Sequence, residues 1–106
     1  MSNVIWVEEG PQTMAVGEAI AWIFDFADVG AADPSAAGTP LAYDGSGIDV
    51  SSTVLSGATS LATSQVTCKK FTPASAQQYV IVQPATVDGN TVYLACKFNV
   101  FDPKYG

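Results

Sequence analysis

Carboxylates are the most plentiful chemically active side chains in this sequence. The chain carries ten Asp and Glu residues against four Lys, with no Arg and no His, for a formal charge of −6. Without an imidazole there is no Ser-His-Asp or Cys-His nucleophile, no His-ligated zinc and no histidine pH switch. The serines have no lysine base in a Ser-x-x-Lys motif, and paired carboxylates for glycoside hydrolysis would need a cleft. We therefore expect no enzyme activity and no cofactor.

The aspartates concentrate in the first half of the chain, at Asp25, Asp28, Asp33, Asp44 and Asp49. The segment 44–49, Asp-Gly-Ser-Gly-Ile-Asp, combines oxygen ligands with glycines, as calcium loops do. It lacks the regular ligand spacing and the closing Glu of an EF-hand, and aspartates that form turns in a solvated loop explain it as well. We favour turn formation, with calcium binding as the alternative.

Two cysteines, Cys68 and Cys96, lie too far apart for a CxxC redox or zinc motif. Each falls in a segment expected to be a strand, on its apolar face. We therefore predict two buried, reduced thiols that act as small hydrophobic side chains. A bridge between them is the alternative, and it requires that the two strands face each other.

The sequence argues against two classes of partner, nucleic acids and membranes. An acidic chain without Arg lacks the cationic surface that a nucleic-acid backbone requires. The basic pair Lys69-Lys70 is expected to be the solvated part of a strand. No apolar run approaches the roughly 20 residues needed to cross a bilayer, so no membrane partner is expected. Residues 1–6 do not resemble a secretory signal either, since they have no basic region and no long apolar stretch.

The pattern of apolar residues predicts strands throughout one domain, residues 1–106. In the segment 19–26 the heavy residues Ile20, Trp22, Phe24 and Phe26 alternate with smaller ones, a period of two that is typical of a strand. We expect a central strand whose heavy face anchors the core, with Trp22 part of that core. Further strands are expected over 3–8, 12–16, 40–44, 48–55 and 65–72, with a loop over 28–38.

The end of the sequence predicts a hairpin, with strands over 78–87 and 91–102 around Asp88-Gly89-Asn90. Pro84 is expected at an edge or a bulge, since proline cannot donate to a ladder. With no convincing helix and frequent turn residues, the chain is predicted to be all-β: an Ig-like antiparallel β-sandwich of about seven strands.

Three aromatic residues are candidates for a partner interface. If the stripe of Val92 and its alternate neighbours faces the core, then Tyr93 and Phe101 face outward on the last strand. Trp6, near the N-terminus, has no assured place in the core. Charged residues are only 13% of the chain, and exposed aromatics with little charge are typical of a subunit buried in an assembly. The alternative is that the chain's own termini cover these side chains.

Two segments resemble a known family. The strand 20–26, Ile-Ala-Trp-Ile-Phe-Asp-Phe, is similar to the apolar strand of small Ig-like virion proteins of tailed bacteriophages, of the fibre–tail adaptor or neck-associated type. The stretch Tyr79-Val80-Ile81-Val82, the Asp-Gly-Asn-Thr turn and the last apolar strand resemble the terminal hairpin of that family. The sequence departs from the family in having Phe26 in place of Trp and no Arg in the hairpin.

The resemblance implies a stoichiometric structural subunit of a phage particle, made in the host cytoplasm and located in the virion. It would act at the neck, at the tail or fibre attachment, or as capsid decoration, through contacts with other virion proteins, and would be oligomeric in the particle. The alternative function is an Ig-like carbohydrate-binding or adhesive module. Its sugar-stacking candidates are Trp6, Tyr43 and Tyr93, although these are spread widely along the chain.

Overall fold

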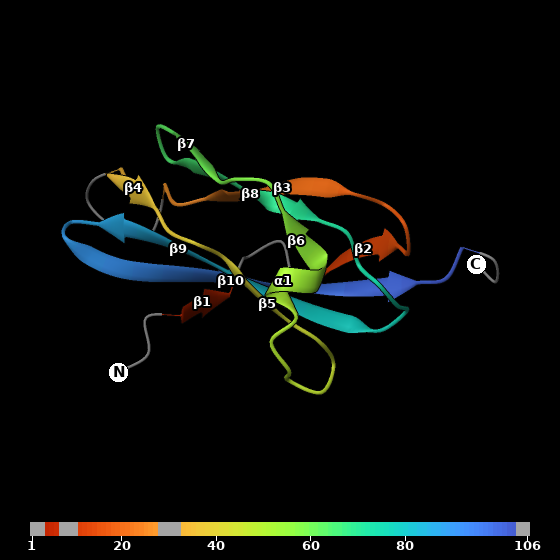
Figure 1. The fold of residues 1–106 in the computed structure, drawn as a ribbon. Coiled ribbons are helices and arrows are strands. Elements are labelled where there is room, and N and C mark those ends of the chain that lie inside the picture. The colour runs from red at the N-terminus through yellow and green to blue at the C-terminus, as the bar shows by residue number, and fades with distance from the viewer. Residues whose placement is uncertain (1–3, 7–10, 28–32, 104–106) are drawn as a thin grey trace.

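Two β-sheets pack face to face in the computed structural model, which describes residues 4–6, 11–27 and 33–103 (Figure 1). The six-stranded sheet contains β1 (Val4–Trp6), β2 (Gln12–Ala15), β4 (Ala36–Ala37), β5 (Leu41–Tyr43), β9 (Gln78–Val87) and β10 (Asn90–Phe101). The four-stranded sheet contains β3 (Ile20–Asp25), β6 (Leu55–Ser56), β7 (Ser60–Ala62) and β8 (Gln65–Phe71). The all-β sandwich class predicted from the sequence is therefore confirmed.

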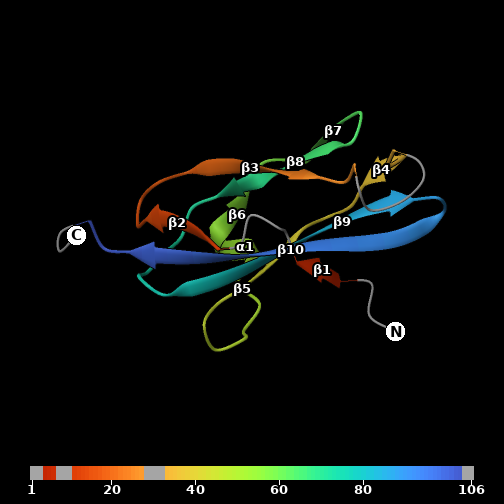
Figure 2. The ribbon, with the colours of Figure 1, turned by 180° about the vertical axis from the view of Figure 1, so that it is seen from behind.

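The hairpin of β9 and β10 forms the centre of the six-stranded sheet, and it lies where the sequence predicts it. Asp88 and Gly89 join the strands with φ angles of 52° and 77°, the positive values that a primed hairpin turn requires. On the side of β9 away from β10, β4 and β5 both pair with β9 in antiparallel orientation. The long hairpin crosses the whole molecule in Figure 2.

The first two strands correct the expected topology. Both pair with β10 in parallel, β1 through Val4 opposite Tyr93 and β2 through Gln12 opposite Phe98. The sandwich is thus not purely antiparallel, and it has more strands than expected because several are only two to four residues long. Alternation in a sequence indicates which face of a strand is apolar, and it carries no information on the direction of the neighbouring strand.

Strand β3 confirms one expectation and corrects another. Phe24 and Phe26 are buried and Trp22 packs against the core, whereas Ile23 on the other face is 58% exposed. The strand is not central, because it pairs only with β8 and ends its sheet. The opposing sheet buries its heavy face, so a heavy face does not require two neighbouring strands.

The region 48–55 also differs from the prediction, since an expected strand there contains a one-turn helix, α1 (Ser51–Val54). The Asp49 carboxylate accepts hydrogen bonds from the backbone N–H of Ser51 at 2.9 Å and from its hydroxyl at 2.5 Å. This side-chain-to-backbone bonding competes with a strand ladder and turns the chain. The short strand β4 likewise lies in a segment expected to be a loop. No helix in the described ranges is long and apolar enough to cross a membrane.

Aromatic side chains occupy the middle of the core. Phe98 lies with its ring centroid 5.0 Å from Trp22 and 5.2 Å from Phe71, and Phe71 lies 5.4 Å from Tyr79. The Trp22 indole N–H points at the sulfur of Met14, 3.2 Å away. Trp22 is therefore part of the core, as predicted.

Pro84 lies inside the sheet, whereas the sequence predicted it at an edge or a bulge. Its carbonyl accepts a hydrogen bond from the Gly38 N–H at 3.0 Å, on the side away from β10. The backbone N and O atoms of one residue in an antiparallel ladder point to the same side of the strand. The N–H group that Pro84 lacks would therefore point away from β10, into the gap between β4 and β5. A Cβ on Gly38 would come within 2.8 Å of the Pro84 ring, so this close approach requires glycine.

Candidate interaction surface

The outward side of the six-stranded sheet carries an apolar patch. Its core-facing residues Ala42, Ile81 and Leu94 are at most 4% exposed, so their neighbours along each strand face outward. The half-buried ones form what we call the outer patch: Leu41, Tyr43, Val80, Val82 and Tyr93, whereas Ala95 on the same face is fully buried.

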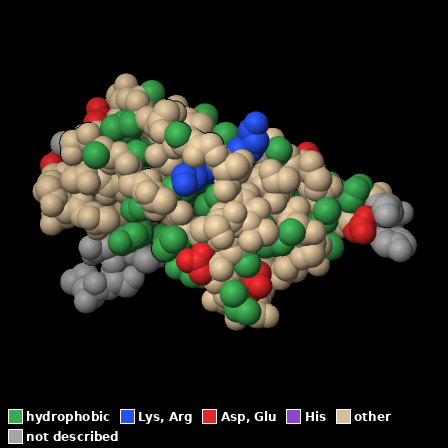
Figure 3. Space-filling view, in the orientation of Figure 1, with side chains coloured by type: hydrophobic (Ala, Val, Ile, Leu, Met, Phe, Trp, Pro, Cys, Tyr) green, Lys and Arg blue, Asp and Glu red, His purple; other side chains and the backbone are tan. Residues whose placement is uncertain are grey.

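Strand register brings the outer patch together. Leu41 lies opposite Val82, and Tyr43 lies opposite Val80. Tyr93 lies opposite Pro84, two residues along β9 from Val82. Figure 3 shows apolar side chains exposed among polar ones over the visible face of the molecule, with few Lys, Asp or Glu side chains between them. The patch therefore crosses three adjacent strands.

Polar residues border the outer patch at one end. Lys97, which lies opposite Val80, is exposed, and so is Asn99 two residues further along β10. The Gln78 side-chain amide donates to the side-chain Oδ1 atom of Asn99 at 3.3 Å. An apolar centre with a polar rim is the usual anatomy of a protein–protein interface.

The structure separates the three predicted interface residues. Tyr93 belongs to the outer patch. Phe101 is 42% exposed and follows the same alternation, but it lies eight residues further along β10, roughly 26 Å away. The backbone of Trp6 in β1 lies beside Ala95, and its side chain is outside the described residues.

Leu41, Val80 and Val82 were not identified from the sequence. Both alternating faces of the segment 78–87 are apolar, so its pattern does not reveal which set points into the core. The signal that distinguishes them is the partner strand. Ile81 aligns with Ala42 and Cys96, and all three are buried.

No family model matches this chain, and a search of curated proteins found no match. The outer patch and the pairing of the strands are therefore the features that bear on function.

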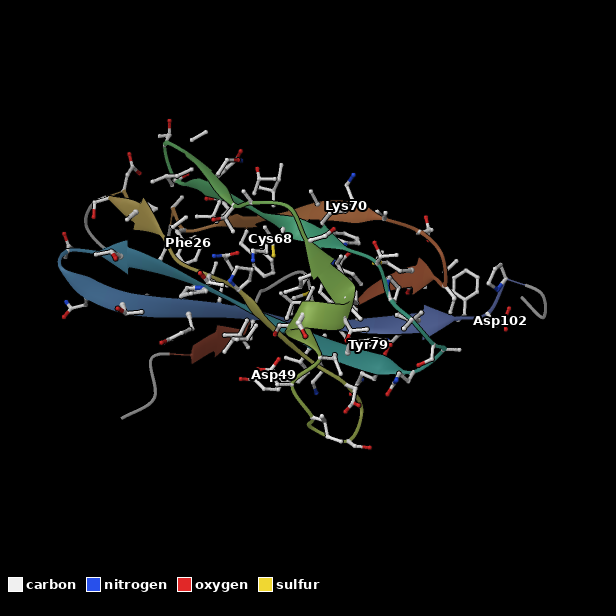
Figure 4. The ribbon with its side chains drawn as sticks, in the orientation of Figure 1. Phe26, Asp49, Cys68, Lys70, Tyr79 and Asp102 are labelled. Atoms are coloured by element: carbon white, nitrogen blue, oxygen red, sulfur yellow. The ribbon has the colours of Figure 1, made fainter. Side chains whose placement is uncertain are left out.

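The segment 44–49 uses its carboxylates to build turns. Asp44 Oδ1 accepts the backbone N–H groups of Ser46 at 2.9 Å and Ile48 at 3.0 Å. Asp49, drawn in Figure 4 beside β5 and α1, accepts the bonds from Ser51, and these hydrogen bonds lower the pKa of its carboxyl. Within the described ranges, no three His, Cys, Asp or Glu side chains gather as a metal site.

Tyr43 and Tyr93, two of the sugar-stacking candidates, share the outer face of the sheet. From the register they lie two strands and four residues apart, which corresponds to roughly 16 Å. One sugar ring cannot stack on both side chains at that separation. An extended glycan is the ligand that would contact the two tyrosines together.

Both cysteines are buried free thiols, as predicted. Figure 4 shows Cys68 between the two sheets, near Phe26. Burial in these apolar surroundings raises the pKa of the Cys68 thiol to about 12 from an ordinary value of 9.0. The thiolate is the reactive form, so Cys68 should be inert toward thiol reagents in the folded protein.

This burial gives a testable dependence on pH. Between pH 9.0 and about 12 the Cys68 thiol ionises in the unfolded chain before it ionises in the folded one. The folded state therefore loses stability as the pH rises through this range. Urea unfolding at about pH 8 and about pH 10.5 should show a smaller loss in Cys68→Ala than in the unsubstituted protein. Equal losses in both proteins would contradict this assignment.

Proposed function

We propose that this sandwich is Ig-like. In one sheet β8 lies between β3 and β6, and in the other β9 lies between β10 and β5. This matches the strand groups BED and CFG of Ig domains. The Tyr79 hydroxyl, near the start of β9, accepts the backbone N–H groups of Ala74 at 3.3 Å and Ser75 at 3.2 Å. This arrangement is a tyrosine corner, as found in Ig domains two residues before the second cysteine, a position that Ile81 holds here.

We further propose that the protein is a structural subunit of a bacteriophage virion, at the neck, at the tail or fibre attachment, or on the capsid. The outer patch carries this proposal, since a half-buried apolar surface with a polar rim is suited to a permanent protein neighbour. The resemblance of the segments 20–26 and 79–91 to phage Ig-like virion proteins supplies the kind of assembly.

The partner in this proposal is another virion protein with an apolar face of similar size. Tyr93 and Tyr43 would be the anchors, because aromatic side chains dominate the energetics of such interfaces. Lys97 and Asn99 would lie at the wet rim, where charged contacts set orientation more than affinity.

Quantitative mass spectrometry on purified particles tests the assignment directly. Copies of this chain are counted against the major capsid protein. A low, ring-like count would place the protein at the neck or tail, and a count equal to that of the capsid protein would make it a decoration subunit. Absence from purified particles would overturn the virion role.

Tyr93→Ala should reduce particle association. Loss of an anchor costs about 2 kcal/mol or more of binding free energy, roughly a 30-fold weakening. The matched control is Ile48→Ala, which shortens a side chain that is 61% exposed in the turn between β5 and α1. Particle-bound copies of each variant are counted after assembly in its presence. Equal incorporation of the two variants would show that Tyr93 is not an anchor.

The second candidate function is a carbohydrate-binding or adhesive module, favoured by the shared face of Tyr43 and Tyr93. Aromatic rings on the outer face of a sheet can stack on successive sugars of a chain. Saturable binding on a glycan array, lost in Tyr93→Ala, would rank this function above the virion role.

A further inference from the structure

Strand β3 presents an open edge. It ends the four-stranded sheet, and none of the described strands pairs with it on the side away from β8. Its sequence, Ile-Ala-Trp-Ile-Phe-Asp, contains neither Pro nor Lys, the residues that commonly protect such edges. The irregularity against β8 places the extra residue on β8, since Ala21 pairs with Lys70 and Ile23 with Thr67, so β3 itself stays regular. The open side of this six-residue strand can thus accept a partner strand.

We propose that β3 pairs antiparallel with β3 of a second copy of this chain, about a two-fold axis at Ile23. Such a contact is isologous and joins the two four-stranded sheets into one continuous sheet. Ile23, 58% exposed, would lie opposite its own copy on the outer face. On the inner face, Trp22 would lie opposite Phe24 of the other copy, which extends the apolar core across the edge.

Charge complementarity selects this partner and this register. With the axis at Ile23, Asp25 of one copy lies opposite Ala21 of the other, and Ala21 is paired with Lys70 of its own copy. Asp25, Ala21 and Lys70 are all exposed on the outer face. Asp25 and the second copy's Lys70 are then two strands apart, roughly 10 Å between Cα atoms, and only the small Ala21 lies between them.

The lysine's long stem can cover that span, and the two-fold axis makes the ion pair twice. If the two-fold axis lay at Trp22 or Phe24, Asp25 would no longer lie opposite Ala21 of the other copy, and it would not be in line with Lys70. The Asp25 Oδ1 atom already accepts the Ser64 hydroxyl at 3.1 Å and the Ala27 N–H at 2.9 Å. Its Oδ2 atom accepts no bond from any described residue, so it is available to the lysine.

The pairing uses the four-stranded sheet and leaves the outer patch free, so it does not rest on the virion role. The experiment is sedimentation velocity of the full chain from about 1 μM to about 1 mM, with amide exchange measured on β3. We expect a reversible dimer whose β3 amides become protected as the concentration rises. A monomer throughout this range would overturn the proposal and leave the edge to a strand of another protein.

Charge reversal tests the register. Lys70→Asp places a carboxylate in line with Asp25 of the other copy, and the two-fold axis makes this repulsion twice. It should raise the dimer Kd roughly tenfold or more. The control, Lys97→Asp, makes the same change of charge on the six-stranded sheet and should leave the Kd within about threefold. Asp25→Lys combined with Lys70→Asp should restore the affinity. Equal Kd values for the Lys70 and Lys97 variants would overturn the register.

Ile23→Asp provides a second test, since it places two carboxylates at the two-fold axis. It should abolish the dimer while the monomer keeps its thermal unfolding midpoint within a few degrees, because the Ile23 side chain is exposed. A dimer that survives Ile23→Asp but is lost in Tyr93→Ala would place the contact on the outer patch and overturn the β3 pairing.

Discussion

Phe98→Ala should lower the free energy of unfolding by about 3–5 kcal/mol, a large share of the ~5–15 kcal/mol that holds a domain folded. Phe98 is 1% exposed and contacts the rings of both Trp22 and Phe71. Its removal therefore opens a cavity between the two sheets, at the point where aromatic residues of β3, β8 and β10 meet. Urea unfolding followed by tryptophan fluorescence measures the loss.

The matched control is Phe101→Ala, the same substitution three residues further along β10. Phe101 is 42% exposed, so this change should alter the free energy of unfolding by about 0.5 kcal/mol or less in the isolated protein. A loss at Phe101 equal to that at Phe98 would contradict the assignment of the core.

Tyr79→Phe should be the next most destabilising change, at about 2–3 kcal/mol, although it removes one oxygen atom. The hydroxyl accepts the N–H groups of Ala74 and Ser75, and it also lies 3.3 Å from the Ser75 hydroxyl. These hydrogen bonds are partly buried, so the loss of each should cost about 1–1.5 kcal/mol. Chemical denaturation gives the loss directly.

Tyr93→Phe removes the same atom from a half-buried residue of the outer patch and serves as the control. Its expected effect on unfolding is within about 0.5 kcal/mol. If Tyr79→Phe were equally mild, the hydroxyl would not fasten the loop 72–77 to β9. The Ig-like assignment would then lose its second line of support.

Elements with strong local signals could be predicted from the sequence. The period of two in 20–26 and the Asp-Gly turn at 88–89 gave the strands β3, β9 and β10 almost to the residue. The short strands β1, β2 and β5 lie within the predicted segments 3–8, 12–16 and 40–44, whereas β4, β6 and β7 could not be predicted, because their two or three residues show no period. The helix α1 arises from hydrogen bonds between Asp49 and Ser51, which compete with the strand propensity of Val50 and Val54.

The candidate surface was only partly predictable. Tyr93 could be assigned to the outer face because the alternate stripe on its strand is apolar and contains Phe98. Val80 and Val82 could not, since Tyr79 and Ile81 on the other face of β9 are equally apolar. Long-range strand pairing determines which face points into the core. The local residue pattern predicts neither the pairing of β5 with β9 nor the parallel placement of β1.

The parallel attachment of β1 and β2 to β10 also sets the order in which the molecule can be completed. Val4 pairs with Tyr93 and Gln12 pairs with Phe98, and these contacts join segments more than 80 residues apart in the sequence. At about 5–20 residues per second of synthesis, the first strands remain without their partner for roughly 4–18 s. Contacts of this separation slow folding, because the intervening loop must close before they contribute any stability. The nascent chain must therefore keep β1 and β2 from pairing with other proteins until its last strand has been made.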